Sequence, residues 1–591
     1  MLKLISYFFL VSACLFLFSQ EMLAQDFEWF EVSGGTRSDK GTQIIADDDG
    51  NTYITGYYNE QGFFGPFDTG FSFQSSKEVY VAKIDPNGNY LWVSNGLNYY
   101  DDRGLGLCLD PQGNVYVTGT CWGGLDWGSL SVYNSTSYTD QIFVVKLDNN
   151  GNEIWMKNAG NDDGTVSFGT NENGDPQTLY QDDHGQDLAC DSNGNIYVTG
   201  FLSNISSQQQ VATFDGITVQ LAPEDSTGFV AKLSNDGNWI WVETFGGEFE
   251  QRDIAITVDD DDNVYLTGAF SGTQSFGPHV MTANGESDIY VTKVDSDGNF
   301  LWARQAGGAL KDVGIDVCYG HSGFIYITGE FRDLGTFGTT ILDNFGGPSG
   351  RDIFVAKMSK SGDWIWANQA GSTKGRDRGN GIVANKQGNI FVTGQFSSET
   401  YFGSNTVDSN GDSVTVFIAG IDTLGAWRWV QTGGGPEYDR GADITCDTSC
   451  NVWVHGYIDN AATFGPFSES PVWDKDAFTV KLNNACFDYS TPPEEPETEQ
   501  CTLLSRNIIT ANGDNLNDVY FFAEQCNVEI DAVVVNRWGN IVFETTDPSI
   551  GWDGTNQRGT PVSEGVYFYR VKTNFSEMTN EEISGFIQVV R

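Results

Sequence analysis

The sequence predicts an all-β protein: a seven-bladed β-propeller closed by an N-terminal strand, followed by a small C-terminal β-sandwich. Three observations support this prediction: a composition poor in helix formers, a long repeat that occurs seven times, and a different strand-rich segment after the last copy. Of 591 residues, 70 are glycine and 14% are aromatic, whereas only 19% are charged. Such a composition is typical of neither a disordered acidic chain nor a coiled coil.

The charge balance narrows the classes of partner. The formal net charge is −49, from 31 Lys and Arg against 80 Asp and Glu. Because a field of this sign repels phosphate backbones, we exclude a nucleic-acid-binding protein. Attachment to an anionic membrane surface is disfavoured for the same reason. Calcium ions and neutral partners such as glycans are compatible with the charge.

Residues 1–24 have the character of a secretory signal peptide. Lys3 precedes an apolar run over residues 4–18, and a polar segment leads to a cleavage site after Ala24. The run is too short to span a membrane comfortably, and no later stretch approaches 18 apolar residues. The alternative is a lipoprotein signal at Cys14, against which the apolar residues after Cys14 argue. We expect an exported mature chain without a transmembrane segment.

A seven-fold repeat defines the first domain. The motif G-N-x-Y-V-T-G has copies that begin at Gly50, Gly113, Gly194, Asp262, Gly323, Gly388 and Cys450. The motif F-V-A-K-L-D also occurs seven times, whereas a Trp placed four residues after a Gly occurs six times. Trp29, near the start of the mature chain, supplies the missing seventh Trp. The N-terminal strand is therefore predicted to complete the last repeat and close a ring of four-stranded blades, which removes exposed sheet edges.

Each repeat is predicted to form four strands. Strand a contains D-x-G, strand b contains Y-V-T-G, strand c contains F-V-A-K-L-D, and strand d carries the Trp. Tight D-x-x-G-N turns join a to b and c to d, with Asp opening the turn and Gly in its left-handed position. The b–c and d–a links are longer, differ between repeats and share the opposite face. We expect function on that variable face.

This repeat resembles the seven-bladed propeller repeat of secreted bacterial proteins over about residues 26–485. We assign the propeller to residues 25–485 and an acidic, proline-rich linker to residues 486–500. Residues 501–591 contain alternating strand patterns that predict the β-sandwich.

The C-terminal segment carries a second resemblance. Its motifs are, in order, Thr510–Asp514, Asn517-Asp518, Asn536-Arg537-Trp538-Gly539, Gly551-Trp552-Asp553-Gly554 and Gly565–Tyr567. They resemble the gliding-motility-associated C-terminal domain, which is similar to the type B sorting domain of the type IX secretion system of Bacteroidota. The resemblance implies export through the periplasm and across the outer membrane to the cell surface or medium. It also implies that the type IX secretion machinery is a partner.

Nine cysteines remain once Cys14 leaves with the signal peptide, so they cannot all pair within one chain. Cys501 and Cys526 flank one compact segment and are the predicted disulfide. The other cysteines mostly lie inside strand patterns, where we interpret them as small buried hydrophobes.

Strand a begins with an aspartate in six repeats. These residues are Asp39, Asp102, Asp183, Asp312, Asp377 and Asp439. One interpretation is a ring of carboxylates at the channel mouth that attracts cations. The favoured alternative is an Asp that accepts backbone N–H groups at each strand start, because the position recurs with the blade itself.

Calcium is the cofactor to which the sequence points, through clusters of oxygen ligands. The tightest cluster comprises Asn512, Asp514, Asn517 and Asp518, for which the alternative is an Asx turn. The runs Asp47–Asp49 and Asp259–Asp262 lack the closing Glu of a twelve-residue calcium loop.

The sequence contains few motifs typical of enzymes. The four histidines form no metal-ligand pattern, and no G-x-S-x-G elbow occurs. We therefore expect a non-catalytic protein that binds a glycan, a matrix component or a protein. The alternatives are an extracellular polysaccharide hydrolase or lyase and a structural component of the surface or gliding machinery.

The ligand site is expected near the second and third repeats, where the largest insertion falls. Its residues are Trp122, Asp126, Trp127, Phe168 and Tyr180. Aromatic planes beside carboxylates suit sugar rings or a protein hot spot. The alternative is that these aromatics only hold a long loop in place.

Overall fold

The computed structural model describes residues 25–487 and 502–590 apart from internal gaps. The gaps are 72–75, 134–138, 162–165, 171–175, 181, 207, 223–224, 247–253, 321, 410–412, 472–473, 504–507, 511–522, 525–529, 547–550, 557, 559 and 574–581. The predicted signal peptide, the Cys501–Cys526 pair and the Asn512–Asp518 calcium cluster lie outside the described residues.

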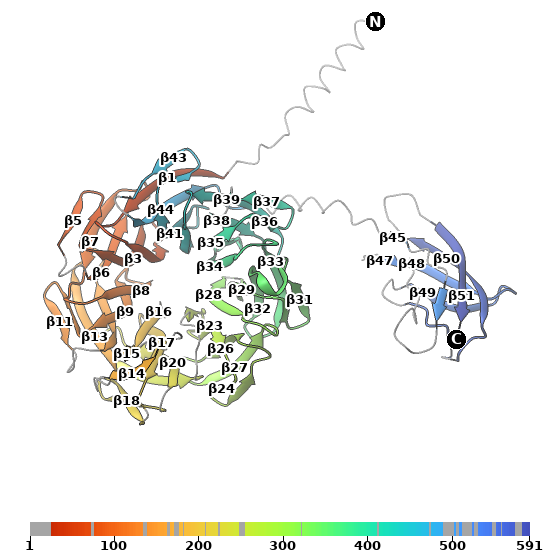
Figure 1. Cartoon of the computed structure of the whole chain (residues 1–591), viewed down its shortest axis with the longest axis horizontal. Coiled ribbons are helices and arrows are strands. Elements are labelled where there is room, and N and C mark those ends of the chain that lie inside the picture. The colour runs from red at the N-terminus through yellow and green to blue at the C-terminus, as the bar shows by residue number, and fades with distance from the viewer. Residues whose placement is uncertain are drawn as a thin grey trace, which may run out of the picture. The chain divides into compact units, whose positions relative to one another are not determined.

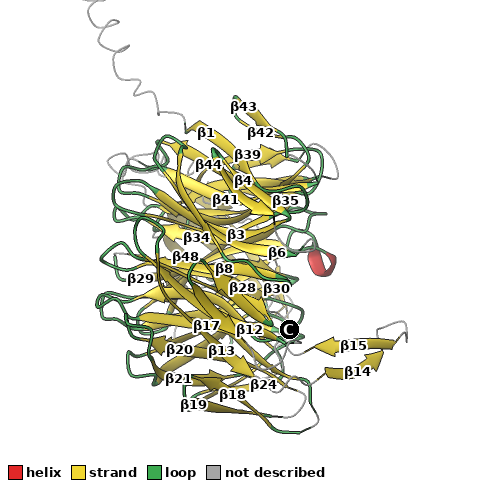
Figure 2. Cartoon of the chain, turned by 90° about the vertical axis from the view of Figure 1, so that its left-hand side faces the viewer, coloured by secondary structure: helices red, strands yellow, loops and turns green. Residues whose placement is uncertain are grey.

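The chain divides into two compact units, Met1–Phe487 and Asp488–Arg591. Both are all-β in their described parts, where one 3-10 turn, Gly347–Ser349, is the sole helical element (Figure 2). Phe487 packs against Phe391, and Cys486 is bonded to the first unit, so this unit extends two residues beyond the predicted boundary at 485.

Seven four-stranded antiparallel sets make up the framework of the first unit, and we call them sheets 1 to 7. In spatial order from the first strand, sheet 1 contains β2 (Lys40–Ala46), β3 (Thr52–Asn59), β6 (Lys77–Ile84) and β7 (Tyr90–Asn95), and sheet 2 contains β8 (Asp102–Leu109), β9 (Val115–Trp122), β12 (Asp140–Leu147) and β13 (Glu153–Asn161). Sheet 3 contains β16 (His184–Cys190), β17 (Ile196–Asn204), β20 (Asp225–Leu233) and β21 (Trp239–Phe245), sheet 4 contains β22 (Ala255–Val258), β23 (Val264–Phe270), β26 (Asp288–Val294) and β27 (Phe300–Ala306), and sheet 5 contains β28 (Val313–Gly320), β29 (Phe324–Phe331), β32 (Asp352–Ser359) and β33 (Trp364–Ala370). Sheet 6 contains β34 (Arg378–Ala384), β35 (Ile390–Ser397), β38 (Val414–Ile421) and β39 (Trp427–Gly434), and sheet 7 contains β40 (Arg440–Cys446), β41 (Val452–Asp459), β44 (Lys475–Asn483) and β1 (Asp26–Ser33).

The N-terminal strand β1 is the fourth strand of sheet 7. It pairs antiparallel with β44, with Phe30 opposite Val480 and Val32 opposite Phe478. The sheets follow one another around a centre in chain order, and β2 of sheet 1 contacts β40 of sheet 7 (Figure 1). The first and last repeats are therefore neighbours in space.

The b–c links are regular hairpins, which corrects the prediction that they vary between repeats. They are β4 (Gln61–Phe64) with β5 (Phe67–Phe71), β10 (Gly124–Trp127) with β11 (Leu130–Tyr133), β18 (Gln210–Phe214) with β19 (Ile217–Leu221), β24 (Thr273–Phe276) with β25 (His279–Thr282), β30 (Leu334–Phe337) with β31 (Thr340–Asp343), β36 (Glu399–Phe402) with β37 (Asn405–Asp408), and β42 (Ala462–Phe464) with β43 (Phe467–Glu469). Each hairpin bonds to the end of the fourth strand of the preceding sheet, as Phe63 does to Gly34. An aromatic residue before the hairpin turn, such as Phe64, anchors it in the core.

Hydrophobic cores lie between neighbouring sheets. One of them joins Val79 and Val81 of sheet 1 to Val117 and Phe143 of sheet 2. Because each sheet is apolar on both faces, it needs a neighbour on each side.

Two disulfides join segments distant in sequence, Cys108 to Cys190 and Cys450 to Cys486. The interpretation of these four cysteines as unpaired hydrophobes was wrong, because packing of β8 beside β16 brings together residues separated by 82 positions. Among the described cysteines, Cys121, Cys318 and Cys446 are free.

The C-terminal unit contains a five-stranded sheet in the order β46 (Ile508–Thr510), β51 (Glu582–Val590), β50 (Gly565–Thr573), β48 (Ile530–Val535) and β49 (Ile541–Thr545), and a separate pair, β45 (Thr502–Leu503) with β47 (Ala523–Glu524). Trp552 is fully buried in its core, and its indole donates to the Thr555 carbonyl at 2.7 Å. Trp538, in the turn after β48, is instead 72% exposed, with the Arg537 guanidinium 4.4 Å from its ring centroid.

Candidate functional site

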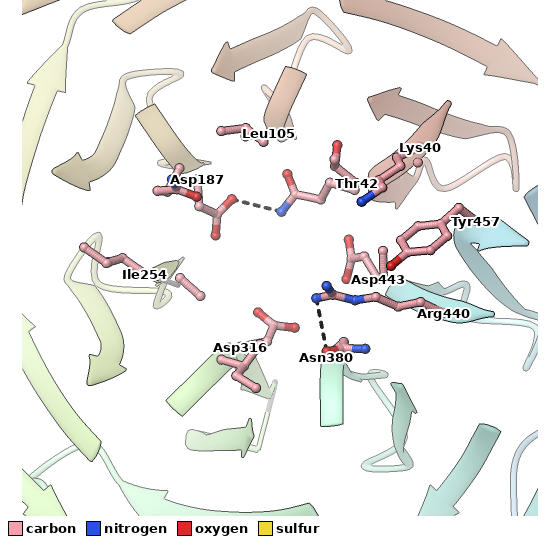
Figure 3. Close-up of a pocket in the computed structure, with 16 residues that line it drawn as sticks. Lys40, Thr42, Leu105, Asp187, Ile254, Asp316, Asn380, Arg440, Asp443 and Tyr457 are labelled. Carbon is pink, nitrogen blue, oxygen red and sulfur yellow. Dashed lines mark hydrogen bonds between the residues drawn. The ribbon is translucent and has the colours of Figure 1, made fainter. Parts of the chain in front are cut away.

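A central cavity lies where the first strands of the seven sheets meet. Its volume is about 220 Å³, and residues in or next to all seven first strands line it (Figure 3). The lining residues are Lys40, Gly41, Thr42, Gln43, Leu105, Gln186, Asp187, Ile254, Ala255, Ile315, Asp316, Asn380, Arg440, Ala442, Asp443 and Tyr457. A concave site with convergent polar groups is the first place to look for ligand binding.

Three carboxylates of this cavity tie adjacent sheets together. Each accepts a backbone N–H bond from the next sheet: Asp187 from Ile256 at 3.0 Å, Asp316 from Ile382 at 2.7 Å, and Asp443 from Ile44 at 2.9 Å. In sheet 1 the equivalent position is Gln43, whose carbonyl accepts from the Leu107 N–H and whose amide donates to Asp187 at 2.9 Å.

Burial dominates the electrostatics of these carboxyl groups. It raises the pKa of Asp187 to about 6, and it raises the pKa values of Asp316 and Asp443, which the nearby carboxylates raise further. Carboxylates accept hydrogen bonds, and the amides of Gln43 and Asn380 both donate and accept them, so the lining suits hydroxyl groups. The described residues contain no group of three His, Cys, Asp or Glu arranged to hold a metal ion.

A set of basic residues stands at the start of the first strands. The residue that follows the strand-opening Asp is Lys40, Arg103, His184, Arg378 or Arg440 in five of the seven repeats. Three of them face carboxylates, with nitrogen–oxygen distances of 3.5 Å for Arg103 and Asp101, 3.5 Å for His184 and Asp140, and 3.7 Å for Arg378 and Glu330. Among the described residues, Lys40 and Arg440 have no carboxylate partner within ion-pair distance.

Lys40 and Arg440 border the cavity from neighbouring sheets, with Tyr457 beside them (Figure 3). The Lys40 ammonium lies 4.7 Å from the centroid of the Tyr457 ring. Arg440 donates to the Asn380 side-chain oxygen at 3.2 Å, whereas its Nε is buried without a hydrogen-bond partner. Sequence reasoning missed both cations, although the recurring basic residue inside D-x-G was the signal that identifies them.

The six strand-opening aspartates are fully buried and do not line the cavity. Their carboxylates accept hydrogen bonds at the strand starts: Asp312, for example, accepts from the Gly308 N–H at 2.6 Å and the Arg332 N–H at 2.8 Å. Backbone N–H groups also donate to the other five, Asp39, Asp102, Asp183, Asp377 and Asp439. This geometry contradicts an exposed ring of carboxylates that attracts cations. It matches the favoured alternative, in which each Asp accepts backbone N–H groups at a strand start.

The predicted aromatic site near the second sheet is not one cluster. Trp127 is fully buried and donates to the Ser94 hydroxyl at 2.9 Å, so it takes the anchoring position that phenylalanine occupies in the other hairpins. Trp122 is half-buried and stacks on Tyr100, with ring centroids 5.5 Å apart. Asp126 is exposed and accepts from Ser131 at 2.5 Å and from Tyr133 at 2.7 Å within its own hairpin.

The predicted residues Phe168 and Tyr180 lie on an added hairpin, β14 (Val166–Thr170) with β15 (Pro176–Tyr180). This hairpin is the insertion between sheets 2 and 3. Trp127 is thus a structural residue, and the insertion carries the other two aromatics.

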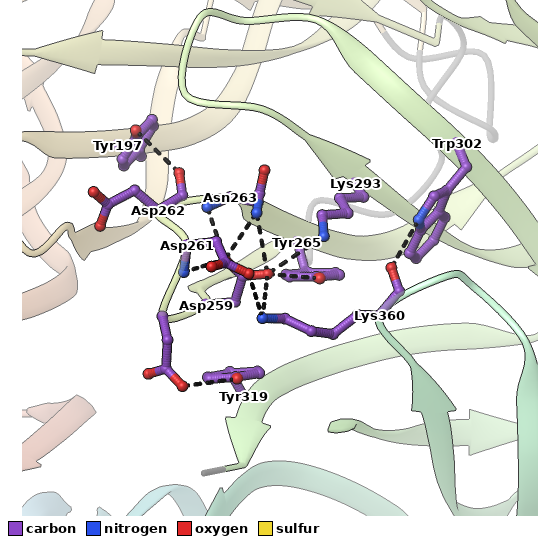
Figure 4. A network of polar contacts seen from close by, with 11 residues as sticks. Tyr197, Asp259, Asp261, Asp262, Asn263, Tyr265, Lys293, Trp302, Tyr319 and Lys360 are labelled. Carbon is purple, nitrogen blue, oxygen red and sulfur yellow. Dashed lines mark hydrogen bonds and ion pairs between the residues drawn. The ribbon is translucent and has the colours of Figure 1, made fainter. Parts of the chain in front are cut away.

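The acidic runs Asp47–Asp49 and Asp259–Asp262 both lie in tight turns between strands. Figure 4 shows the second run. One Asp259 oxygen accepts from Asn263 N–H at 2.9 Å, and the other lies 3.3 Å from both Lys293 Nζ and Lys360 Nζ. Desolvation opposes ionisation of Asp259, but hydrogen bonds from Asn263 and Tyr265 and the Lys293 ammonium outweigh it and lower the pKa to about 2. Asp47 likewise accepts from Asn51, at 2.8 Å. Calcium at Asp259 would have to compete with two ammonium groups.

Comparison with known proteins identifies the C-terminal unit. Residues 503–589 match the model of the CHU_C type IX secretion signal domain. A signal of this class indicates export to the cell surface or medium by the type IX secretion machinery. Among the described residues, no helix is long and apolar enough to cross a membrane.

The chain also has more distant relatives. The chain is 24% identical over 335 residues to the uncharacterized WD repeat-containing protein L264 of Acanthamoeba polyphaga mimivirus, which covers 49% of this chain and 24% of that protein. It is 23% identical over 368 residues to the regulatory protein FlaEY of Caulobacter vibrioides, covering 61% of this chain and 38% of that protein. Thus the chain spans well under half the length of these relatives. A puromycin hydrolase structure aligns with a TM-score of 0.39 and 11% identity, covering 74% of this chain and 55% of that chain.

Proposed function

We propose that this protein is an exported seven-bladed β-propeller, closed by β1, that binds an extracellular glycan, matrix or protein ligand without transforming it. The type IX signal supports export. Membership of β1 in sheet 7 and the contact between β2 and β40 support ring closure.

The observation that carries the binding function is the central cavity with its two cations, Lys40 and Arg440, which lack carboxylate partners among the described residues. A buried or half-buried charge without a counter-charge costs stability, so it is typical of a place where a ligand supplies the missing partner. The ligand site therefore lies at the centre of the first unit, on the side where the first strands begin.

A glycan and matrix-protein array probed with residues 25–591 tests this function. We expect binding that is weakened by Arg440→Gln and retained by Trp122→Ala, because Trp122 lies outside the cavity lining. Binding that depends on Trp122 and not on Arg440 would move the site to the second sheet.

One observation favours a second candidate, an extracellular polysaccharide hydrolase or lyase. Asp316 and Asp443 share the cavity and have raised pKa values, which glycosidases require of a general acid. Against this candidate, both carboxylates are committed to backbone N–H groups of neighbouring strands. Release of reducing ends from polysaccharides by the wild type, lost in Asp443→Asn, would establish the enzyme.

A further inference from the structure

The cavity mouth is rich in positively charged side chains, although the molecule as a whole is strongly negative. In a chain of net charge −49, five cationic side chains gather around Tyr57, Tyr438 and Tyr457. They are Lys40, Lys77, Arg103, Arg440 and Lys475. Lys77 and Lys475 are neutralised by Asp101 at 2.6 Å and Asp459 at 3.0 Å. Arg103 also faces Asp101, so these five cations share two carboxylates, and Lys40 and Arg440 are the two without a carboxylate partner among the described residues.

The tyrosines hold these cations in fixed positions. Tyr457 is buried, stacks on Tyr438 with ring centroids 6.3 Å apart, and has Lys40 and Lys475 at 4.7 and 5.5 Å from its centroid. Desolvation and the four neighbouring cations lower the pKa of Lys40. An anion placed between Lys40 and Arg440 would relieve this repulsion.

We infer that Lys40 and Arg440 form a carboxylate subsite for an acidic sugar, a hexuronate residue of an extracellular polysaccharide. The inference rests on the proposed binding function and names its ligand class. The carboxylate lies against the two cations, and the sugar hydroxyls face Gln43, Asn380 and Asp443, which line the same cavity.

Size and charge favour a sugar over a larger anion. The cavity of about 220 Å³ is below the roughly 300–1,000 Å³ typical of drug-sized ligand sites, and so it suits a single ring or a chain end. Hydroxyl-binding amides and carboxyls beside the cations match a polyol that carries one negative charge.

Calorimetric titration of residues 25–591 with trigalacturonate, and with the neutral galactose trisaccharide, tests the inference. We expect the acidic trisaccharide to bind at least about tenfold more tightly than the neutral one, since charge-assisted bonds are the strong ones. Lys40→Gln and Arg440→Gln should each weaken binding by about tenfold or more, and Arg440→Lys should restore part of it. Lys386→Gln is the matched control, because Lys386 is exposed in a turn and pairs only with Asp48, 3.9 Å away.

Equal affinity for the two trisaccharides, or acidic binding that survives both Gln variants, would overturn the inference. If the protein binds neutral glycans or proteins and not trigalacturonate, the inference fails while the proposed binding function stands. If no glycan or matrix ligand binds at all, both fail. The melting temperature of each variant is compared with that of Lys386→Gln. A variant that binds weakly but melts at the same temperature has lost a ligand contact and is still folded.

Discussion

The indole nitrogen of Trp29 donates a hydrogen bond to the carbonyl oxygen of Pro86, 3.1 Å away. Trp29 belongs to the fourth strand of sheet 7, and Pro86 lies in the c–d turn of sheet 1. The same bond, 3.0–3.2 Å long, joins every sheet to the next through Trp92 to Asn149, Trp155 to Asn235, Trp241 to Ser296, Trp302 to Lys360, Trp366 to Thr423 and Trp429 to Ala485.

Glycine in the turn makes this contact possible. Gly88 has a φ of +89°, and a Cβ there would lie 3.2 Å from the Trp29 ring. The tryptophan of each sheet therefore covers the turn of its neighbour, which is the physical meaning of the repeated Trp.

Removal of residues 25–35 should sharply lower the melting temperature. Phe27, Trp29 and Phe30 are buried against sheet 7 and its neighbours, and each buried aromatic contributes about 1.5–3 kcal/mol. The deletion also exposes the edge of β44. Thermal melting followed by circular dichroism measures the effect, with the exposed-site variant Trp538→Ala as control. An unchanged melting curve would show that β1 does not close the ring.

Trp127→Ala should destabilise the first unit by about 3–5 kcal/mol, because it empties a fully buried site. Trp122→Ala should cost far less, since Trp122 is only half-buried and loses mainly its stacking on Tyr100. Urea unfolding of the two variants gives both free energies. If Trp122→Ala were the more destabilising of the two variants, Trp127 would not be a core residue.

Stability should fall as pH rises from about 5 to 8. Burial raises the pKa of Asp312 to about 7, above the roughly 3.9 of an unfolded aspartate, so the folded state binds more protons in this window. The contribution is complete below about pH 4 and is lost as pH rises through 7. Melting temperatures from pH 4.5 to 8 should show a shallower decline for Asp312→Asn than for the wild type.

Asp259→Asn provides the control for this pH series. The pKa of Asp259 is lowered to about 2, so its stabilisation is present above about pH 4 and is lost only as pH falls through 2. Its substitution should lower stability without changing the slope between pH 5 and 8. If Asp259→Asn changed the slope of melting temperature against pH between pH 5 and 8, or if Asp312→Asn left it unchanged, Asp312 would not be a source of the decline.

Export should require the C-terminal unit. A chain that ends at Glu499 should fold, because the first unit has its own cores, and should remain inside the cell envelope. Trp552→Ala should block export by unfolding the signal domain, whereas Trp538→Ala should leave it folded, since Trp538 is 72% exposed. Immunoblots of medium, surface and periplasm distinguish these outcomes. Normal secretion of the truncated chain would refute the requirement.

Local patterns were sufficient to predict much of the framework. The Tyr-Val-Thr-Gly and Phe-Val-Ala-Lys motifs mark strands by their own periodicity, and the lone Trp29 places the N-terminal strand with the last repeat. The hairpins between strands b and c were missed because each is short and its only constant signal is one aromatic residue before a turn, Phe64 in the first copy.

The candidate site was harder to predict than the framework. Trp122 and Trp127 are close in sequence, yet one is half-buried and the other lies in the core, because Trp122 ends β9 whereas Trp127 stands before the turn of the β10–β11 hairpin, at the position that anchors it. The cavity instead combines residues as distant in sequence as Lys40 and Arg440, which come together only because β2 and β40 pack side by side.

By itself, the sequence determined the all-β class, the seven-fold order of strands and the C-terminal sorting signal, because these depend on local periodicity and on motifs within one segment. The tertiary structure alone decided which charges lack partners. Among the described residues, Lys40 and Arg440 have the same D-x-G context as Arg378, but of these three only Arg378 faces a carboxylate. That carboxylate, Glu330, belongs to β29 of the neighbouring sheet, and so the difference between a paired cation and one without a carboxylate partner arises only when the sheets pack side by side.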